Sequence, residues 1–237
     1  MNTRERTLNR LSRSTSAIIA GAGILIMAII APIVNFFILE EMIKSDTLSK
    51  NPENILASEN QLRLSIVLNL IIVILDIIVA WALFIFLCPI NKSLALLAAW
   101  FRIVYSILFV VSLFYLIHTL PLIIDGNLEV KYIQSQVALS LNNFFLSWDV
   151  AMILFGFHLL LIGYLFLKAR YMKKILGVLL LIASIGYIVD GFGQVLSSGY
   201  KIKITLYTFI GEVVLIFWLL LKGWKVKSSE QKQETYS

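Results

Sequence analysis

Charged residues are scarce in this chain of 237 residues, because Asp, Glu, Lys and Arg together make up 14% of it. A soluble domain carries about 25% charged residues, so the composition excludes an ordinary soluble fold. Hydrophobic residues account for 59% of the chain, and they gather in long uncharged runs that are typical of membrane-spanning helices. The sequence therefore predicts an all-α polytopic membrane protein, a bundle of transmembrane helices.

Cysteine is nearly absent, and Cys88 is the only one. A single cysteine excludes an internal disulfide and a paired-cysteine metal clip. The chain has two histidines, and it shows no HExxH motif, no Walker loop and no zinc-ligand spacing. We therefore expect no cofactor and no metal site. No motif identifies a catalytic residue, so the sequence leaves open whether the protein is an enzyme.

Six apolar segments are long enough to cross a hydrocarbon core about 30 Å thick. Each must be helical, because lipid offers no hydrogen-bond partner to a free backbone amide. The segments are 17–39, 64–87, 94–117, 145–167, 175–196 and 205–221. They predict a basic N-terminal stretch at 1–16, a single six-helix membrane domain at 17–222 and a polar tail at 223–237.

The distribution of Lys and Arg predicts how the chain sits in the membrane. If the N-terminus is inside, thirteen of the 20 basic residues lie in inner segments and six in outer ones, while Arg102 lies within a span. The inner set is Arg4, Arg6, Arg10, Arg13, Lys92, Lys168, Arg170, Lys173, Lys174, Lys222, Lys225, Lys227 and Lys232. This bias predicts a multi-pass protein of the cell membrane with both termini in the cytoplasm.

The net charge of +6 is accounted for by this topology, so we do not expect nucleic acid as a partner. The partners we expect are membrane lipids, together with an unidentified small molecule or lipid as ligand.

Two segments between the spans carry helix signals. Asn51-Pro52-Glu53 is a typical helix start, and we expect that helix to continue into the second span. Apolar residues between Val130 and Leu141 recur at helical spacing. They predict a helix that either lies on the membrane surface or extends the fourth span.

Proline and glycine mark special points within the spans. Pro32, followed by Asn35, predicts a kink in the first span. Gly156 and Gly163 lie seven residues apart on one face of the fourth span and predict close helix packing.

Ionisable residues also occur within the predicted spans. A charged side chain at the centre of a membrane helix costs about 2.5 to 3.5 kcal/mol on insertion scales. Such residues must therefore be paired, hydrated or protonated. The set is Asp76, Arg102, Asp149, His158, Asp190 and Glu212.

The depth of the second and third spans predicts one ion pair. With a rise of 1.5 Å per residue, Asp76 lies about 16 Å and Arg102 about 12 Å from the inner end of the bundle. A tight turn joins these two antiparallel spans, so we expect Arg102 to hold Asp76. Asn69 lies two helical turns from Asp76 on the same face and extends this polar stripe.

The same calculation sorts the other groups into two levels. His158 and Glu212 come to about 13 Å from the inner end, which places them in one layer with Asp76 and Arg102. Asp149 and Asp190 come to about 27 Å and 22 Å, and they predict an outer rung near the mouth of a cavity. The four inner residues are the candidate polar cluster.

Four stretches form a pattern that covers nearly the whole chain. They are NILASENQLRLSIVLNL, CPINKSLALLAAWFRIVYSIL, LFGFHLLLIGYLFLKARYMKKILGVLLLIASIGYIVDGFGQVL and GEVVLIFWLLLKGW. In these stretches the chain resembles an uncharacterised bacterial family of polytopic membrane proteins known as domain of unknown function 4386. The family pattern has acids at Asp76, Asp190 and Glu212, arginines at Arg63 and Arg102, and a histidine at His158. The family often has Ser and Pro after the fourth span, whereas residues 169–173 of this chain contain no proline. The resemblance implies a six-helix integral membrane protein and implies no activity.

Three interpretations remain, in this order of preference. In the first, Asp76, Arg102, His158 and Glu212 line a polar cavity that binds or transports a small molecule or lipid. In the second, the protein is structural or regulatory and its buried charges serve helix packing. In the third, it is an intramembrane lipid-modifying or metal-dependent enzyme, with Glu212 or Asp76 as base and His158 as metal ligand or acid.

Overall fold

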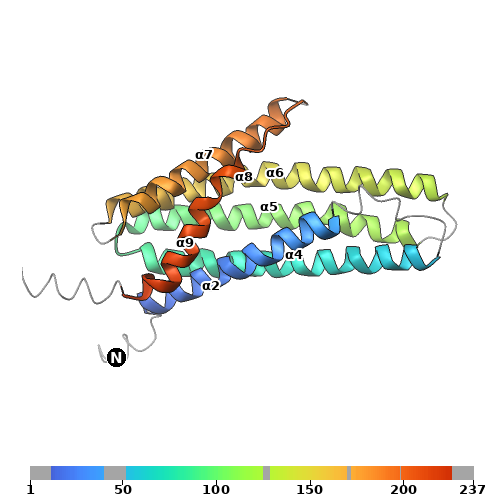
Figure 1. The fold of residues 1–237 in the computed structure, drawn as a ribbon. Coiled ribbons are helices and arrows are strands. Elements are labelled where there is room, and N and C mark those ends of the chain that lie inside the picture. The colour runs from blue at the N-terminus through green and yellow to red at the C-terminus, as the bar shows by residue number, and fades with distance from the viewer. Residues whose placement is uncertain (1–11, 40–51, 125–128, 170–171, 198, 226–237) are drawn as a thin grey trace, which may run out of the picture.

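The computed structural model of the chain describes residues 12–39, 52–124, 129–169, 172–197 and 199–225. This part of the chain forms helices joined by turns and short loops, with no strand in it (Figure 1). The helices are α2 (Arg13–Pro32), the π-helix η1 (Ile33–Leu39), α4 (Pro52–Leu87), α5 (Lys92–Ile124), α6 (Val130–Lys168), α7 (Lys174–Leu196), α8 (Thr205–Thr208), α9 (Ile210–Leu221) and the 3₁₀-helix η2 (Gly223–Lys225). The protein is therefore an all-α bundle.

Five helical segments are long and apolar enough to cross a membrane. They are Arg13–Leu39, Glu59–Leu87, Lys92–Ile124, Lys131–Lys168 and Lys174–Leu196. The sixth expected span is a shorter apolar helix at Thr205–Leu221, and Phe209 divides it into α8 and α9. The backbone N–H groups of both Glu212 and Val213 donate to the carbonyl of Phe209, so α9 starts afresh at this residue.

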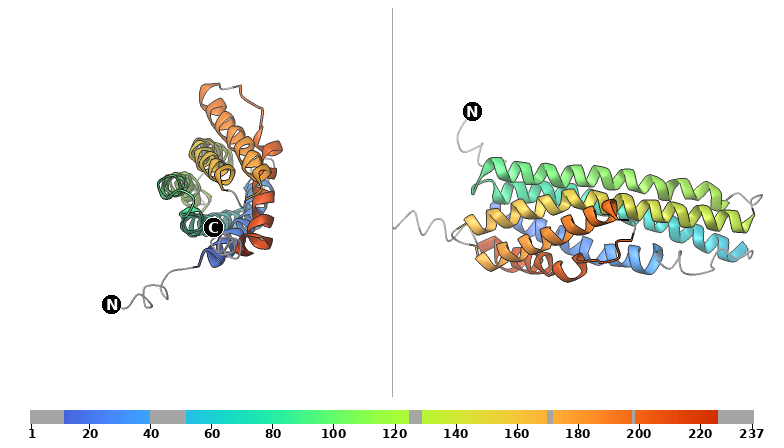
Figure 2. Two further views of the ribbon diagram at one scale, coloured as in Figure 1. Left: turned by 90° about the vertical axis from the view of Figure 1, so that its left-hand side faces the viewer. Right: turned by 90° about the horizontal axis from the view of Figure 1, so that it is seen from above.

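The main helices close into a ring. Neighbouring helices along the chain pack against each other: α2 on α4, α4 on α5, α5 on α6 and α6 on α7. The ring is completed by α9, which packs against both α7 and α2. The end-on view in Figure 2 shows these helices surrounding a common interior. We call proximal the end where α2 begins and α9 ends, and distal the end where α5 ends and α6 begins. Buried side chains of these six helices therefore face the common interior of the ring.

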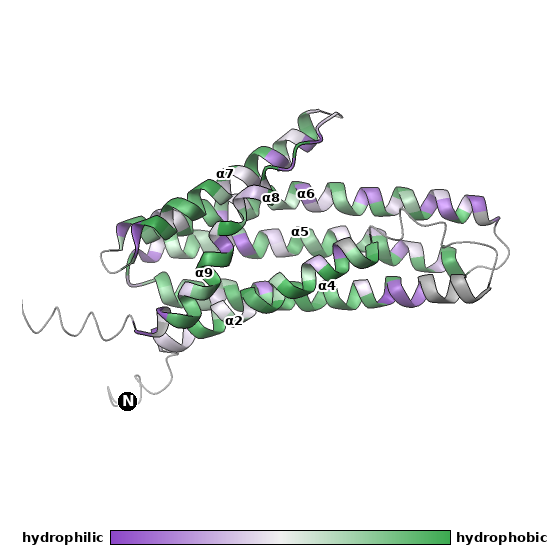
Figure 3. Cartoon of the chain, viewed as in Figure 1, coloured by the Kyte–Doolittle hydropathy of each residue, from purple (hydrophilic) through white to green (hydrophobic). Residues whose placement is uncertain are grey.

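Three of the helices are longer than their apolar segments predicted. α4 begins at Pro52 and runs without a break to Leu87, which confirms the expected continuous helix; the expected cap, Asn51, lies outside the described residues. Of the two interpretations of the stretch from Val130 to Leu141, extension of the fourth span is right, because α6 begins at Val130. Figure 3 shows hydrophilic residues along the distal parts of α4 and α6. Hydropathy alone missed these turns because their residues are polar.

Pro32 marks a change of helix type. α2 ends at Pro32 and the chain continues as the π-helix Ile33–Leu39. Proline has no N–H to donate to the preceding turn, so the α-helical hydrogen-bond ladder is interrupted here. π-helical segments are rare and frequent at functional sites. This segment carries Asn35, whose side chain is buried.

Glycines set the packing of α6 against α7. A Cβ added to Gly163 would lie 2.9 Å from the carbonyl oxygen of Gly177, and one added to Gly177 would lie 2.8 Å from that of Gly163. Seven residues away on each helix, a Cβ on Gly156 would lie 3.1 Å from the carbonyl oxygen of Ser184. The backbones of α6 and α7 are therefore in contact at two points that lie two helical turns apart. This confirms the packing role expected for Gly156 and Gly163.

Candidate functional site

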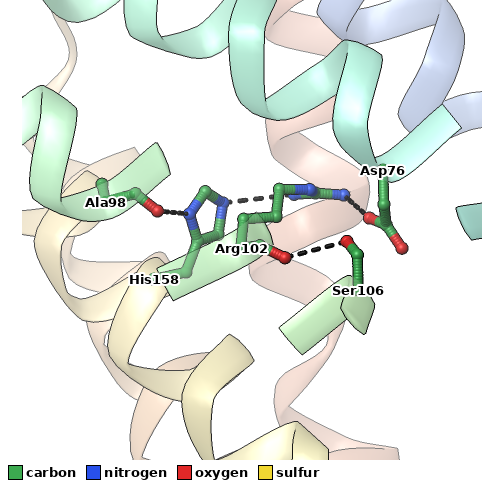
Figure 4. A network of polar contacts seen from close by, with 5 residues as sticks. All are labelled: Asp76, Ala98, Arg102, Ser106 and His158. Atoms are coloured by element: carbon green, nitrogen blue, oxygen red, sulfur yellow. Dashed lines mark hydrogen bonds and ion pairs between the residues drawn. The ribbon is translucent and has the colours of Figure 1, made fainter. Parts of the chain in front are cut away.

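The ion pair predicted from the two hairpin spans is present at the centre of the site. Nη2 of Arg102 donates to Oδ1 of Asp76 at 2.5 Å, across the α4–α5 interface. The two residues are 3% and 2% exposed, respectively. The Ser106 hydroxyl donates to the Arg102 carbonyl on the same helix (Figure 4). Asp76 is thus held within the bundle by a buried counter-ion.

His158 extends this pair onto a third helix. Its Nε2 lies 3.1 Å from Nη1 of Arg102, and its Nδ1 lies 2.8 Å from the carbonyl oxygen of Ala98. A guanidinium only donates hydrogen bonds and a carbonyl only accepts them. Nε2 must therefore be the acceptor, and Nδ1 must carry the proton. The contacts with Arg102 and Ala98, drawn in Figure 4, together fix His158 as one neutral tautomer.

Glu212 does not join this group by a hydrogen bond, and its expected place in one layer with Asp76, Arg102 and His158 stays a prediction. Its Oε1 accepts from the hydroxyl of Tyr187 on α7 at 2.7 Å. That is the one side-chain hydrogen bond of Glu212 among the described residues. Arg102 and Asp76 interact with Glu212 electrostatically over a longer distance. The predicted cluster is therefore two groups, one on α4, α5 and α6 and the other on α7 and α9.

Phe155 lies between the two groups. Its ring centroid is 5.7 Å from that of His158 and 5.2 Å from that of Tyr187. The Cζ atom of Arg102 lies 5.2 Å from the same centroid, as in a cation–π contact. Phe155 and Tyr187 are not predicted from the sequence, because the chain holds 15 Phe and 9 Tyr and neither residue is marked by a motif. The spacing of Phe155, one turn before His158, is the signal that could have found it.

In the part of the chain that the structure describes, several buried polar atoms have no hydrogen-bond partner. They are Oδ1 and Nδ2 of Asn69, Nε of Arg102 and Oδ1 of Asn35. Leaving such an atom unpaired costs about 1 to 3 kcal/mol, and most buried polar groups in proteins find a partner. These atoms therefore have hydrogen-bonding capacity that the described part of the chain leaves unused.

Asp190 of the expected outer rung has a partner for each oxygen. Oδ1 accepts from the Tyr200 hydroxyl at 2.6 Å and from the Ile204 amide at 3.0 Å. Oδ2 accepts from the amide and the hydroxyl of Thr205, both at 2.8 Å. The hydrogen bond to this carboxylate raises the pKa of Tyr200 to about 12. Asp190 thus caps the start of α8 from a neighbouring helix, and a functional role for it stays a prediction.

Asp149, the other member of the outer rung, is half-buried on α6. It lies close enough to Lys203 for a favourable charge–charge interaction and close enough to Asp190 for repulsion. A Cβ added to Gly191, next to Asp190, would lie 2.9 Å from the carbonyl oxygen of Asp149. The two acids are therefore neighbours across the α6–α7 contact.

The cap at Asp190 carries a testable consequence for the segment before α8. We expect Tyr200→Phe to speed backbone hydrogen exchange at 199–209, because it removes one of the bonds to the carboxylate. The effect should correspond to about 1 kcal/mol of local stability. Tyr207→Phe is the matched control, because Tyr207 is 80% exposed. Equal exchange in both variants would mean that the bond from Tyr200 to the carboxylate does not stabilise this segment.

Metal-binding side chains are not gathered in the part of the chain that the structure describes. No three His, Cys, Asp or Glu residues there lie close enough together to hold a metal ion. The expected absence of a metal or cofactor stays a prediction.

The apolar helices and the buried polar groups together define a polytopic helical membrane protein. The chain belongs to the family described as "Domain of unknown function (DUF4386)", which it matches over residues 19–223. An "Uncharacterized protein" of the archaeon Archaeoglobus fulgidus is 41% identical over 162 residues, which cover 68% of this chain and 85% of the relative. No solved structure matches the chain. Because this relative is archaeal, a bacterial origin of the chain stays a prediction.

Proposed function

We propose that the protein binds or transports a small molecule or lipid at the two polar groups inside the helix ring. One observation carries the proposal: Arg102, His158 and Tyr187 surround the ring of Phe155, and hydrogen bonds link them to Asp76 on α4 and Glu212 on α9. Intramembrane ionisable residues are costly, and they commonly mark substrate or ion pathways. The binding position borders the Asp76–Arg102–His158 group and the Tyr187–Glu212 pair, beside the Phe155 ring that separates them.

The charges of the two groups favour a ligand that brings a proton or a positive charge. Arg102 is paired with Asp76, and the neutral tautomer of His158 supplies no charge. Among the described residues, the side chain of Glu212 is hydrogen-bonded to the neutral hydroxyl of Tyr187 alone. A carboxylate in this setting is stabilised when it takes up a proton or meets a cation. Exchange between these two states would couple solute binding to protons.

We also propose that the proximal end faces the cytoplasm, as the distribution of basic residues predicts. Lys168, Lys173, Lys174, Lys222 and Lys225 all lie at or beyond the proximal ends of α6, α7 and α9. In this orientation the distal ends of α4, α5 and α6 project to the opposite side of the membrane.

Native mass spectrometry in mild detergent tests the binding proposal. We expect the wild-type protein to carry a small molecule or lipid that both Glu212→Gln and His158→Ala lose. His118→Ala and Glu129→Gln are matched controls, because both side chains are exposed, and they should retain it. A bound species of equal abundance in all five proteins would contradict the proposal, and so would an empty wild type.

A structural role for the charges is the second candidate, and one observation favours it. The chain of bonds from Asp76 through Arg102 and His158 ends on the carbonyl of Ala98, so much of this group is satisfied internally. In that case His158→Ala would lower the melting temperature without changing what the protein carries. The same mass spectra, recorded beside thermal unfolding curves, separate the two candidates.

A further inference from the structure

Buried polar residues are distributed unevenly along α4 and α5. On the distal side of the Asp76–Arg102 pair, five polar side chains are no more than 1% exposed: Ser65, Asn69, Ser106, Ser112 and Thr119. We call them the distal polar stripe. On the proximal side, all described buried residues of these helices are apolar: Val79, Ala80, Ala82, Leu83, Phe86, Leu87, Ala95, Ala98 and Ala99. The pair therefore separates a distal stretch of these two helices, which buries polar side chains, from a proximal stretch that buries apolar ones alone.

The four hydroxyl groups of the stripe bond to their own helices. Each donates to a carbonyl three or four residues earlier in the chain, as Ser65 does to Leu62 and Ser112 does to Leu108. A hydroxyl oxygen that donates still offers lone pairs as acceptor. Such bonds are common in membrane helices, so the hydroxyls by themselves do not indicate a ligand.

The side chain of Asn69 points to a ligand independently of the hydroxyl groups. Its side chain is fully buried, and neither its carbonyl oxygen nor its amide nitrogen has a partner. It lies seven residues from Asp76, which is two turns or about 10 Å towards the distal end. Helix packing does not account for an amide in an apolar bundle with all its hydrogen bonds unmade.

The other unpartnered buried atoms show the same bias. Nε of Arg102 lies at the ion pair itself. Asn35 lies in the distal half of the bundle, since η1 follows the distal end of α2 and packs against α4. The unpartnered atoms of Asn69, Arg102 and Asn35 are thus all at the pair or distal to it.

We propose that water reaches the Asp76–Arg102 pair from the distal end along the distal polar stripe, while the apolar residues close the proximal end. Water suits these groups because a buried water makes about two to four hydrogen bonds and both donates and accepts. The unpaired amide of Asn69 and the lone pairs of the stripe hydroxyls offer both kinds of partner. This proposal rests on the proposed function for the identity of the site. It deepens that function by assigning the side of the membrane from which a solute enters.

Cysteine labelling tests the passage, because only a thiolate in contact with water reacts with a charged thiosulfonate reagent. The background is Cys88→Ala, and the protein is reconstituted in lipid nanodiscs so that both ends are exposed to reagent. We expect Asn69→Cys and Ser112→Cys to react with methanethiosulfonate ethylammonium at least about tenfold faster than the controls. The controls are Ala82→Cys and Ala95→Cys, which are equally buried on the proximal side.

The outcomes separate the passage from the proposed function. If Asn69→Cys and Ser112→Cys react no faster than the proximal controls, the passage is wrong even where the wild type carries a bound molecule. Fast labelling at both positions supports the passage even where the wild type carries none. Ser112→Cys replaces one oxygen by sulfur, so it decides the question should Asn69→Cys fail to fold.

Discussion

Arg102→Leu is expected to lower the free energy of unfolding by about 3 to 5 kcal/mol, the usual cost of breaking a buried ion pair from one side. The variant leaves the carboxylate of Asp76, 2% exposed, without its counter-ion. It also leaves Nε2 of His158 without its donor. The measurement is unfolding in mixed micelles with increasing denaturing detergent, followed by circular dichroism.

Two controls give this prediction its physical content. The double variant Asp76→Leu with Arg102→Leu should recover a large part of the loss, because it removes both buried charges together. Arg63→Leu breaks the Arg63–Glu59 pair, in which Nε and Oε1 are 2.7 Å apart and the arginine side chain is 52% exposed. That exposed pair should contribute no more than about 1 kcal/mol. Equal losses for Arg63→Leu and Arg102→Leu would contradict the burial argument.

The Asp76–Arg102 pair could be predicted from the sequence because a short turn fixes how its two helices meet. α4 ends at Leu87 and α5 begins at Lys92, so counting residues back from the turn gives the depth of both side chains. Antiparallel neighbours at similar depth then come into contact. The pair is a local property of a hairpin, and hydropathy was enough to locate that hairpin.

The partner of Glu212 could not be predicted in the same way. Counting from Leu221 gave its depth but not the face of the helix on which it lies. The rotation of α9 is set by Phe209, where α8 ends and α9 begins, and by the connection from α7. Neither feature can be recognised from the hydropathy of the sequence. Tyr187 therefore emerged as the partner only from the three-dimensional arrangement.

Asp190 shows a second limit of the sequence. Its depth suggested a rung of acids, whereas two of its four donors are backbone amides, those of Ile204 and Thr205. Backbone donors are not specified by side-chain identity, so no residue pattern marks them. The protonation of His158 is hidden for the same reason, because it depends on the carbonyl of Ala98.

Gly177→Ala is expected to destabilise the protein by about 1 to 3 kcal/mol, the usual cost of overpacking a close contact. In an ordinary helix interior, glycine to alanine is favourable by about 1 kcal/mol. Here the new Cβ would lie 2.8 Å from both the carbonyl oxygen of Gly163 and the side chain of Leu167. A backbone oxygen cannot turn aside as a flexible side chain can, so α6 and α7 must separate. The denaturing-detergent titration described above measures the loss.

Gly199→Ala is the matched control, because its added Cβ would meet only Oγ of Ser197, at 4.0 Å. We expect that variant to stay within about 0.5 kcal/mol of the wild type. Gly163→Ala should resemble Gly177→Ala, and the double variant should cost less than the two losses added together, because one separation of the helices relieves both contacts. If Gly177→Ala were instead more stable than the wild type, the gain in helix propensity would exceed the cost of the new contact. The backbones of α6 and α7 would then not touch at this position. Because α6 carries His158 and Phe155 while α7 carries Tyr187, the distance between α6 and α7 also sets the distance between the two polar groups.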